Sequence, residues 1–540
     1  MSTIGEAGQG EAPGIVPGWA AADAGDAALV VATSYGPVRG RREGDVVSWK
    51  GVRFAAPPTG AGRWRPPGPP RPWSEVADAG AFGPVAPQQR NPLIDLGPGA
   101  VEDEDCLFLN VWAPADRSGG PRPVLFWIHG GAYVLGATTQ PLYDASSLVR
   151  NGKVVVVSAA YRLGALGFAD LRSLAAAGSG VDANPALRDI LFALQWVQRN
   201  IAAFGGDPGQ VTIFGESAGA GCVTTLLAVP AAEGLFHRAI AQSSPATSVY
   251  SAERAARVAR LLAERAGVSP DAPGALGALE QLDAQTLTRA AMQVFAEIPA
   301  QAPGTLAFAP VVDGELLPER PVPVIRRGEA LPVPLLIGTN RDETTGFRKA
   351  RSPLLPIDGP AVERMFADIA EQRPELALPE RAQLLSAYAG MPTKAVLSGI
   401  TRDIAFRMPT IWLVEGHSRR APAWLYRYDW APPMLRVAGL GAAHATELPY
   451  VWGNLPTGHR DVTFRLGGRR TGAELSARMQ RRWLSFALGG EPEGPEGSVP
   501  WPAYDESRRA TLVIDRHDRL VDDLDSSLRA AWGEAVLSFL

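Results

Sequence analysis

The chain has 540 residues, of which 46% are hydrophobic and 20% are charged. This is the composition of a globular protein with a large core, and it excludes a disordered chain, a fibrous protein and a coiled coil. The 52 basic and 56 acidic residues give a net charge of -4, so there is no excess positive charge to bind a nucleic acid backbone.

The numbers of cysteines and histidines and the hydropathy of the chain exclude further classes of protein. The two cysteines, Cys106 and Cys222, exclude a scaffold held together by several disulfides. The six histidines include no pair at metal-ligand spacing, so we expect no metal site. The first residues lack the basic and apolar regions of a signal peptide, and no apolar run reaches the roughly 18 residues of a transmembrane helix. We therefore expect a cytoplasmic protein that binds neither nucleic acid nor membrane.

In chain order, residues 1–27 are rich in small and acidic residues without periodicity and predict a flexible tail. Strand-like runs follow at 28–40 and 45–54, and then a connector rich in proline and glycine at 57–73. From there strands alternate with helices. The predicted strands cover 124–131, 153–162, 211–217, 237–244, 333–340 and 423–430, and the predicted helices cover 183–208 and 218–229. This alternation predicts an α/β fold with a large, mostly parallel central sheet covered by helices.

The helix predicted at 183–208 has start and stop signals, with Asn184 as the expected N-cap and Pro185 at the first helical position. Residues 250–330 and 350–420 indicate mostly helical insertions, which we expect to form a cap or the walls of a cleft. We expect residues 28–540 to be a single catalytic domain with these insertions rather than three separate domains.

One pentapeptide, Gly215-Glu216-Ser217-Ala218-Gly219, lies between a predicted strand and a predicted helix. In that context a G-x-S-x-G sequence is typical of a nucleophile elbow, a tight turn that exposes the serine hydroxyl. Glycines flank the serine because larger side chains would collide with neighbouring strands. The pattern therefore predicts Ser217 as a nucleophile. The structural alternative for this pattern is a helix N-cap serine in a glycine-rich loop.

A second glycine motif, His129-Gly130-Gly131-Ala132, ends an earlier predicted strand. Acyl transfer needs N–H donors aimed at the oxyanion of the transition state, and glycine amides are well suited to that task. Gly130 and Gly131, together with the amide of Ala218, are the predicted donors.

A serine nucleophile needs a base and an acid that orients the base. The histidines that follow Ser217 are His237, His417, His444, His459 and His517. His444 is favoured because it lies in a loop of small residues after an apolar strand. The acid should follow a strand, and both Asp342 and Glu343 meet that condition. Position in the sequence therefore leaves both as candidates for the acid that orients the histidine.

The ordered blocks LFWIHGGAY, WVQRNIAAFGGDPGQVTIFGESAGA, GTNRDET and HATELPYVWGN, among others, resemble the type-B carboxylesterases, a family that includes bacterial para-nitrobenzyl esterases and cholinesterases. The resemblance covers about residues 28–540. It implies an α/β-hydrolase fold without a cofactor. It also implies a triad and an oxyanion hole, with Ser217 as nucleophile, Glu343 as acid, His444 as base, and Gly130, Gly131 and Ala218 as donors.

The same resemblance implies a buried polar network of Glu216, Ser243 and Glu447 behind the histidine. It also indicates that Cys106 has lost its usual disulfide partner, because Ala86 stands where the family often has cysteine.

We therefore expect a serine carboxylesterase that hydrolyses neutral, moderately apolar esters. Candidate pocket walls, for which core packing is an equal alternative, are Tyr133, Phe168, Phe308, Phe347 and Trp452. Two other functions stay open: an amide or carbamate hydrolase with the same triad, and a non-catalytic binding module of the same fold.

Overall fold

The computed structural model of the chain describes residues 29–92, 94–176, 178–356, 358–455 and 462–540. The tail predicted at 1–27 and the candidate His459 lie outside the described residues.

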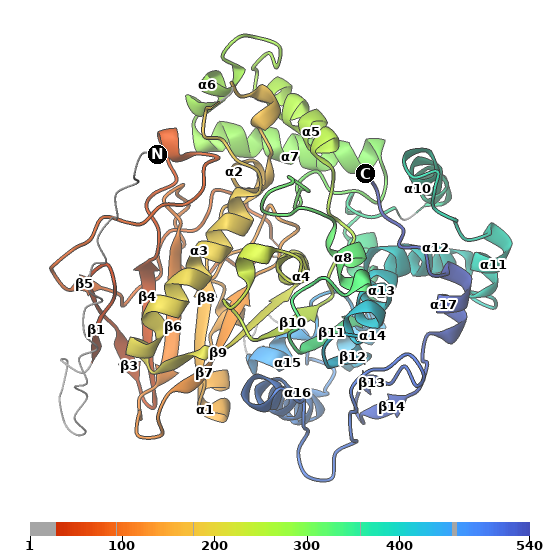
Figure 1. Ribbon diagram of the computed structural model, residues 1–540. Helices are drawn as coiled ribbons and strands as arrows, with labels where there is room; N and C mark the ends of the chain where they lie inside the picture. The colour runs from red at the N-terminus through yellow and green to blue at the C-terminus, as the bar shows by residue number, and fades with distance from the viewer. Residues whose placement is uncertain (1–28, 93, 177, 357, 456–461) are drawn as a thin grey trace, which may run out of the picture.

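A large sheet forms the centre of the described part of the chain, with the strand order β14-β13-β12-β11-β10-β9-β7-β8-β6-β4-β3 (Figure 1). Its strands are β3 (Arg41–Glu43), β4 (Val46–Arg53), β6 (Phe108–Pro114), β7 (Arg122–Ile128), β8 (Val155–Ala159), β9 (Gly206–Glu216), β10 (Arg238–Gln242), β11 (Leu335–Asn340), β12 (Ala423–Tyr428), β13 (Thr511–Ile514) and β14 (Arg519–Val521). Neighbouring strands run parallel from β13 to β8 and antiparallel towards both edges. A small separate sheet contains β1 (Val30–Ala32), β2 (Pro37–Arg39) and β5 (Ala77–Asp78).

Helices follow most of the parallel strands. They are α1 (Ser146–Gly152), α2 (Gly164–Phe168), α3 (Pro185–Asn200), α4 (Ala218–Leu226), α5 (Ala252–Arg265), α6 (Ala275–Glu280), α7 (Ala284–Gln301), α8 (Pro321–Arg327), α9 (Thr345–Lys349), α10 (Gly359–Gln372), α11 (Arg381–Ser386), α12 (Thr393–Arg402), the π-helix η7 (Asp403–Arg407), α13 (Met408–His417), α14 (Pro433–Val437), α15 (Leu448–Trp452), α16 (Arg469–Gly489) and α17 (Ser526–Trp532). Among the described residues, no helix combines the length and apolarity that crossing a membrane would require.

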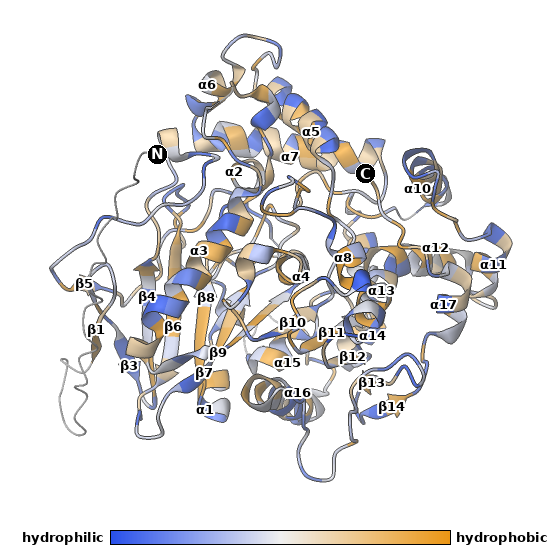
Figure 2. Ribbon diagram, viewed as in Figure 1, coloured by the Kyte–Doolittle hydropathy of each residue, from blue (hydrophilic) through white to orange (hydrophobic). Residues whose placement is uncertain are grey.

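Both faces of the central sheet are buried, because successive side chains along a strand point to opposite faces. On β7, Phe126 and Ile128 belong to one buried cluster, whereas Leu125 and Trp127 belong to another. Helices α3, α4 and α13 contribute to the first cluster, and α1, α15 and α16 contribute to the second. Figure 2 accordingly shows the central strands mainly in orange and α3 with blue turns on its outer side.

The helix predicted at 183–208 is shorter in the structure, and one detail of its start is different. Pro185 is the first residue of α3, as predicted, but Asn184 makes no capping hydrogen bond. Its side chain instead donates to the Val311 carbonyl and accepts from the Val311 amide, each at 2.8 Å. Asn184 therefore links the start of α3 to the loop around residue 311. Its backbone is in the left-handed conformation, with a φ of 56°.

The two insertions enter the fold on either side of β11. Helices α5 to α8 lie between β10 and β11, and helices α9 to α13 lie between β11 and β12. In Figure 1, α5, α6 and α7 lie above the carboxyl ends of the central strands, and α10, α11 and α12 lie beside them. Both insertions therefore adjoin the edge of the sheet where an α/β fold places its ligand site.

Both cysteines are buried as free thiols, and burial raises the pKa of each. A buried thiol with a raised pKa has little thiolate and is chemically inert.

We predict that dithiothreitol changes neither the melting temperature nor the rate of ester hydrolysis. Iodoacetamide should leave the native protein unmodified and should label both Cys106 and Cys222 after denaturation. A shift of several degrees on reduction would reveal a disulfide and contradict the assignment.

Candidate active site

Ser217 occupies the turn between β9 and α4, with a φ of 56° and a ψ of -126°. A non-glycine residue in this region carries strain of about 1–3 kcal/mol. The turn is tightly packed: a Cβ on Gly215 would lie 2.6 Å from the Gly219 carbonyl carbon, and one on Gly219 would lie 2.1 Å from the Ile128 oxygen. Both flanking positions therefore require glycine, as the sequence pattern predicted.

The loop after β7 passes close to this turn. A Cβ on Gly130 would lie 3.1 Å from the Ser217 Cβ, and Gly131, with a φ of 122°, leaves no space for a side chain beside the Leu135 oxygen. Within the described residues, the N–H groups of Gly130, Gly131 and Ala218 donate to no other group. All three residues line the same cavity as Ser217. Their donors are thus available to an oxyanion formed beside the serine.

His444 lies in the loop before α15 and contacts a buried carboxylate. Its Nδ1 is 2.6 Å from Glu343 Oε2. The other oxygen of Glu343 accepts from the Ser243 hydroxyl at 2.5 Å and from the backbone N–H of Asn340 at 2.7 Å. Glu343 is fully buried, so these bonds fix its orientation and hold the imidazole in one position.

The neighbouring acid, Asp342, faces away from the imidazole. Its Oδ2 accepts from the Ala442 amide at 2.9 Å and from the Arg341 guanidinium at 3.0 Å. Asp342 therefore holds the base of the histidine loop in place. Of the two acids that the sequence left open, only Glu343 contacts His444.

Two further buried carboxylates, Glu447 and Glu216, lie near the imidazole. Glu447 accepts from Gln242 at 3.0 Å and from the Asn340 side chain at 2.5 Å, and Gln242 in turn accepts from Trp483 at 3.2 Å. Gln242 and Asn340 are the last residues of β10 and β11. The sequence analysis missed both, although a polar residue at the carboxyl end of a buried parallel strand is a usable signal.

Glu216 lies on the other side of His444, with Oε1 3.1 Å from Nε2. Neither atom has a hydrogen-bond partner among the described residues, because the geometry at that distance is not that of a hydrogen bond. In the neutral form of the imidazole, Nε2 is therefore free to accept a proton from a group in the cavity. Hydrogen bonds of this kind are often unformed before substrate binds.

The electrostatics of the site depend on these carboxylates. Burial opposes the charged imidazole, but Glu216, Glu343 and Glu447 outweigh it and raise the pKa of His444 to about 9. Burial also raises the pKa of Glu216 and of Glu447. Groups coupled this closely titrate as a cluster.

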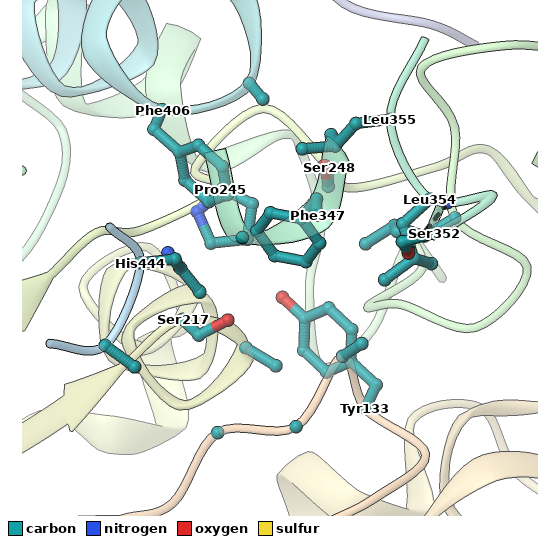
Figure 3. A pocket seen from close by; sticks show the side chains of 18 of the residues that line it. Tyr133, Ser217, Pro245, Ser248, Phe347, Ser352, Leu354, Leu355, Phe406 and His444 are labelled. Carbon is teal, nitrogen blue, oxygen red and sulfur yellow. Dashed lines mark hydrogen bonds between the residues drawn. The ribbon is translucent and has the colours of Figure 1, made fainter. Parts of the chain in front are cut away.

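The serine and the imidazole face a cavity of about 990 Å³ (Figure 3). Of the predicted wall residues, Tyr133 and Phe347 line this cavity, and Figure 3 shows both rings beside Ser217. The predictions for Phe168, Phe308 and Trp452 are corrected. Phe168 packs behind the Tyr133 ring, Phe308 is fully buried in the core, and Trp452 packs against other aromatic rings on the opposite face of the sheet.

A further aromatic ring at the site, Phe406, was not found from the sequence. It lines the cavity, and its ring centroid lies 4.9 Å from that of His444. Phe406 belongs to the π-helix Asp403–Arg407, a local widening that has no recognised sequence signal. The Arg407 guanidinium, bonded to Thr339 on β11, ties this turn to the sheet.

A mostly parallel sheet with a serine on a strand–helix turn, and with a histidine–acid pair at the same edge, defines the α/β-hydrolase class. A solved structure of a PNB esterase supports this class, with a TM-score of 0.82 and 36% identity over 94% of this chain and 99% of that chain. The fold class predicted from the sequence is thereby confirmed.

The sequence pattern of the carboxylesterase family matches residues 27–531. The para-nitrobenzyl esterase of Bacillus subtilis (strain 168) is 38% identical, over 93% of this chain and 97% of that protein. The fumonisin B1 esterase of Sphingopyxis macrogoltabida is 35% identical, over 91% of this chain and 87% of that protein. The chain therefore belongs to the carboxylesterase family, and it is a serine carboxylesterase that hydrolyses carboxylic esters.

We predict that Glu216→Gln lowers the pKa of His444 by about one unit, because it removes a negative charge close to the imidazole. The pKa is measured by NMR titration of protein labelled at the histidine rings. Glu233→Gln, which changes an exposed carboxylate elsewhere, is the control and should leave the His444 titration unchanged. A raised or unchanged pKa in Glu216→Gln would contradict the electrostatic assignment.

Proposed function

We propose that Ser217, His444 and Glu343 are the catalytic triad of this carboxylesterase. The observation that carries the proposal is the contact of 2.6 Å between His444 Nδ1 and Glu343, beside a cavity that the strained Ser217 also faces. Because Nδ1 contacts Glu343, the neutral imidazole keeps its proton on Nδ1 and leaves Nε2 unprotonated.

In the proposed reaction, Ser217 Oγ attacks the ester carbonyl carbon while His444 Nε2 takes the hydroxyl proton. The amides of Gly130, Gly131 and Ala218 hold the resulting oxyanion. His444 then gives its proton to the leaving alcohol, and an acyl group stays on the serine. Water repeats these steps, with His444 again as base, and releases the carboxylic acid.

The proposed substrates are neutral, moderately apolar esters. Support comes from the cavity, whose lining includes Tyr133, Phe347, Phe406 and Leu448 close to the serine and the histidine. Hydrolysis of amides or carbamates through the same steps stays a secondary hypothesis.

We also propose that residues 28–540 fold as one catalytic domain. Its support is that one of the two buried clusters contains residues from Val31 near the start to Phe539 near the end of the chain. A cytoplasmic location is part of the same proposal, and cell fractionation would test it.

We predict that Ser217→Ala lowers kcat by about 10⁴–10⁶-fold, because the members of a triad act as a unit. A fluorophosphonate probe followed by peptide mass spectrometry should label the native protein on Ser217. The second serine of the site, Ser243, is the internal control. Labelling of Ser243, or full activity of Ser217→Ala, would exclude Ser217 as the nucleophile.

We predict opposite outcomes for the two adjacent acids. Glu343→Gln keeps the shape but removes the charge that orients His444, so kcat on an activated ester at pH 8 should fall by about 10²–10⁴-fold. Asp342→Asn keeps a group that can accept from Ala442, and it should cost about tenfold or less, because Asp342 contacts Ala442 and Arg341 and not the imidazole. The assignment of the acid fails if Asp342→Asn is the more damaging change.

A further inference from the structure

Residues 537–539 line the cavity that contains Ser217 and His444, although they lie over 300 residues beyond the nucleophile in the sequence. Leu537 and Phe539 are 1% and 6% exposed. In Figure 1 this part of the chain, marked by the letter C, lies beside α7 and α10, close to the carboxyl edge of the sheet. It forms no helix or strand after α17.

Side-chain hydrogen bonds hold this segment along its length. Trp412 donates to the Gly533 carbonyl at 3.1 Å, and Arg373 donates to the Ser538 hydroxyl at 3.0 Å. The Leu540 amide donates to the side chain of Gln372 at 3.0 Å. Because both sides of residues 537–539 are fastened, their side chains have a fixed position at the cavity.

Leu537 and Phe539 adjoin other apolar residues that line the cavity. Met365 and Ile369 on α10 are fully buried, and Leu306 belongs to the loop after α7. A Cβ on Gly304 in that loop would lie 2.8 Å from the Met365 sulfur and 3.5 Å from the Phe539 ring. We call the set of Leu306, Met365, Ile369, Leu537 and Phe539 the apolar wall.

The apolar wall makes no hydrogen bond or ring contact with Ser217 or His444, in contrast to Phe347 and Phe406, whose rings contact the imidazole. It therefore has no evident part in the bond-making steps. Its apolar side chains can interact favourably only with an apolar group of the substrate. The cavity of about 990 Å³ is at the upper end of the range for sites that hold drug-sized molecules. An acetyl ester alone would leave most of it unfilled.

We propose that Leu537 and Phe539 determine specificity by closing the cavity with the apolar wall, so that the enzyme selects esters that carry a bulky apolar group long enough to reach it. This inference rests on the proposed action of Ser217 on esters. The bulky group belongs to either the acid or the alcohol part of the ester, and the two are chemically equivalent for an apolar surface.

The test measures kcat/KM for two series of esters. The first varies the acid part in p-nitrophenyl acetate, butyrate, octanoate and decanoate. The second varies the alcohol part in methyl, butyl, octyl and benzyl acetates. The readout is the ratio of long to short esters within each series, because general damage to the protein lowers all members equally.

Phe539→Ala should move the preferred ester to a longer one and change the ratio of long to short esters by about tenfold. Phe539→Trp should move the preference to shorter esters, because the larger ring takes space from the substrate. Met365→Ala, on the facing helix, should act in the same direction as Phe539→Ala, and it provides an independent variant if Phe539→Ala fails to fold. The series whose ratio moves identifies the part of the ester that contacts the wall.

Val536→Ala is the matched control, because Val536 belongs to the same segment but does not line the cavity, and its ratios should equal those of the wild type. Unchanged ratios in the Phe539 and Met365 variants, with fluorophosphonate labelling of Ser217 intact, overturn the role of the wall and leave the proposed function standing. Failure of the wild type to hydrolyse either series or to react with the probe overturns the proposed function as well.

Discussion

The contact between the Glu343 carboxylate and the His444 imidazole is the interaction on which the rest of the site depends. A buried carboxylate is costly unless its oxygens accept hydrogen bonds. Ser243 and the Asn340 amide meet that requirement for Glu343. These donors come from the carboxyl ends of β10 and β11, so the position of the histidine depends on the register of two neighbouring parallel strands.

The same dependence extends to the serine. Gly215 and Gly219 allow β7, β9 and α4 to approach so closely that a methyl group would not fit between them. Close packing on both faces of the sheet supports the strained backbone of Ser217, since strain persists only where the surroundings hold it. The serine and the proposed oxyanion donors are thus positioned by packing, whereas the histidine and its acid are positioned by hydrogen bonds between buried carboxylates and neutral donors.

Most of the lining of the cavity comes from other parts of the chain than Ser217, His444 and Glu343 do. Its lining comes from the loop after β7, from both helical insertions and from residues 537–539. Phe406 lies beside the histidine on a π-helix, and Phe539 is held at the cavity because Arg373 and Gln372 bind the neighbouring residues Ser538 and Leu540. If these segments select the substrate as we propose, selection can change through them without disturbing the proposed triad.

By itself the sequence determined the parts of this protein that are encoded locally. Alternating strands and helices predicted the parallel sheet, and the glycines around Ser217 and at Gly130 and Gly131 predicted two tight backbone turns, because only glycine fits there. The position of Asp342 and Glu343 after a strand did not decide which of them orients His444. The family resemblance favoured Glu343, and in the structure only Glu343 contacts the imidazole. Only the tertiary structure separated cavity walls from core, moving Phe168, Phe308 and Trp452 to the core and adding Phe406 and Phe539 to the cavity. The physical reason is that an aromatic side chain has the same hydropathy in either place, and its location depends on contacts between segments that are far apart in the chain.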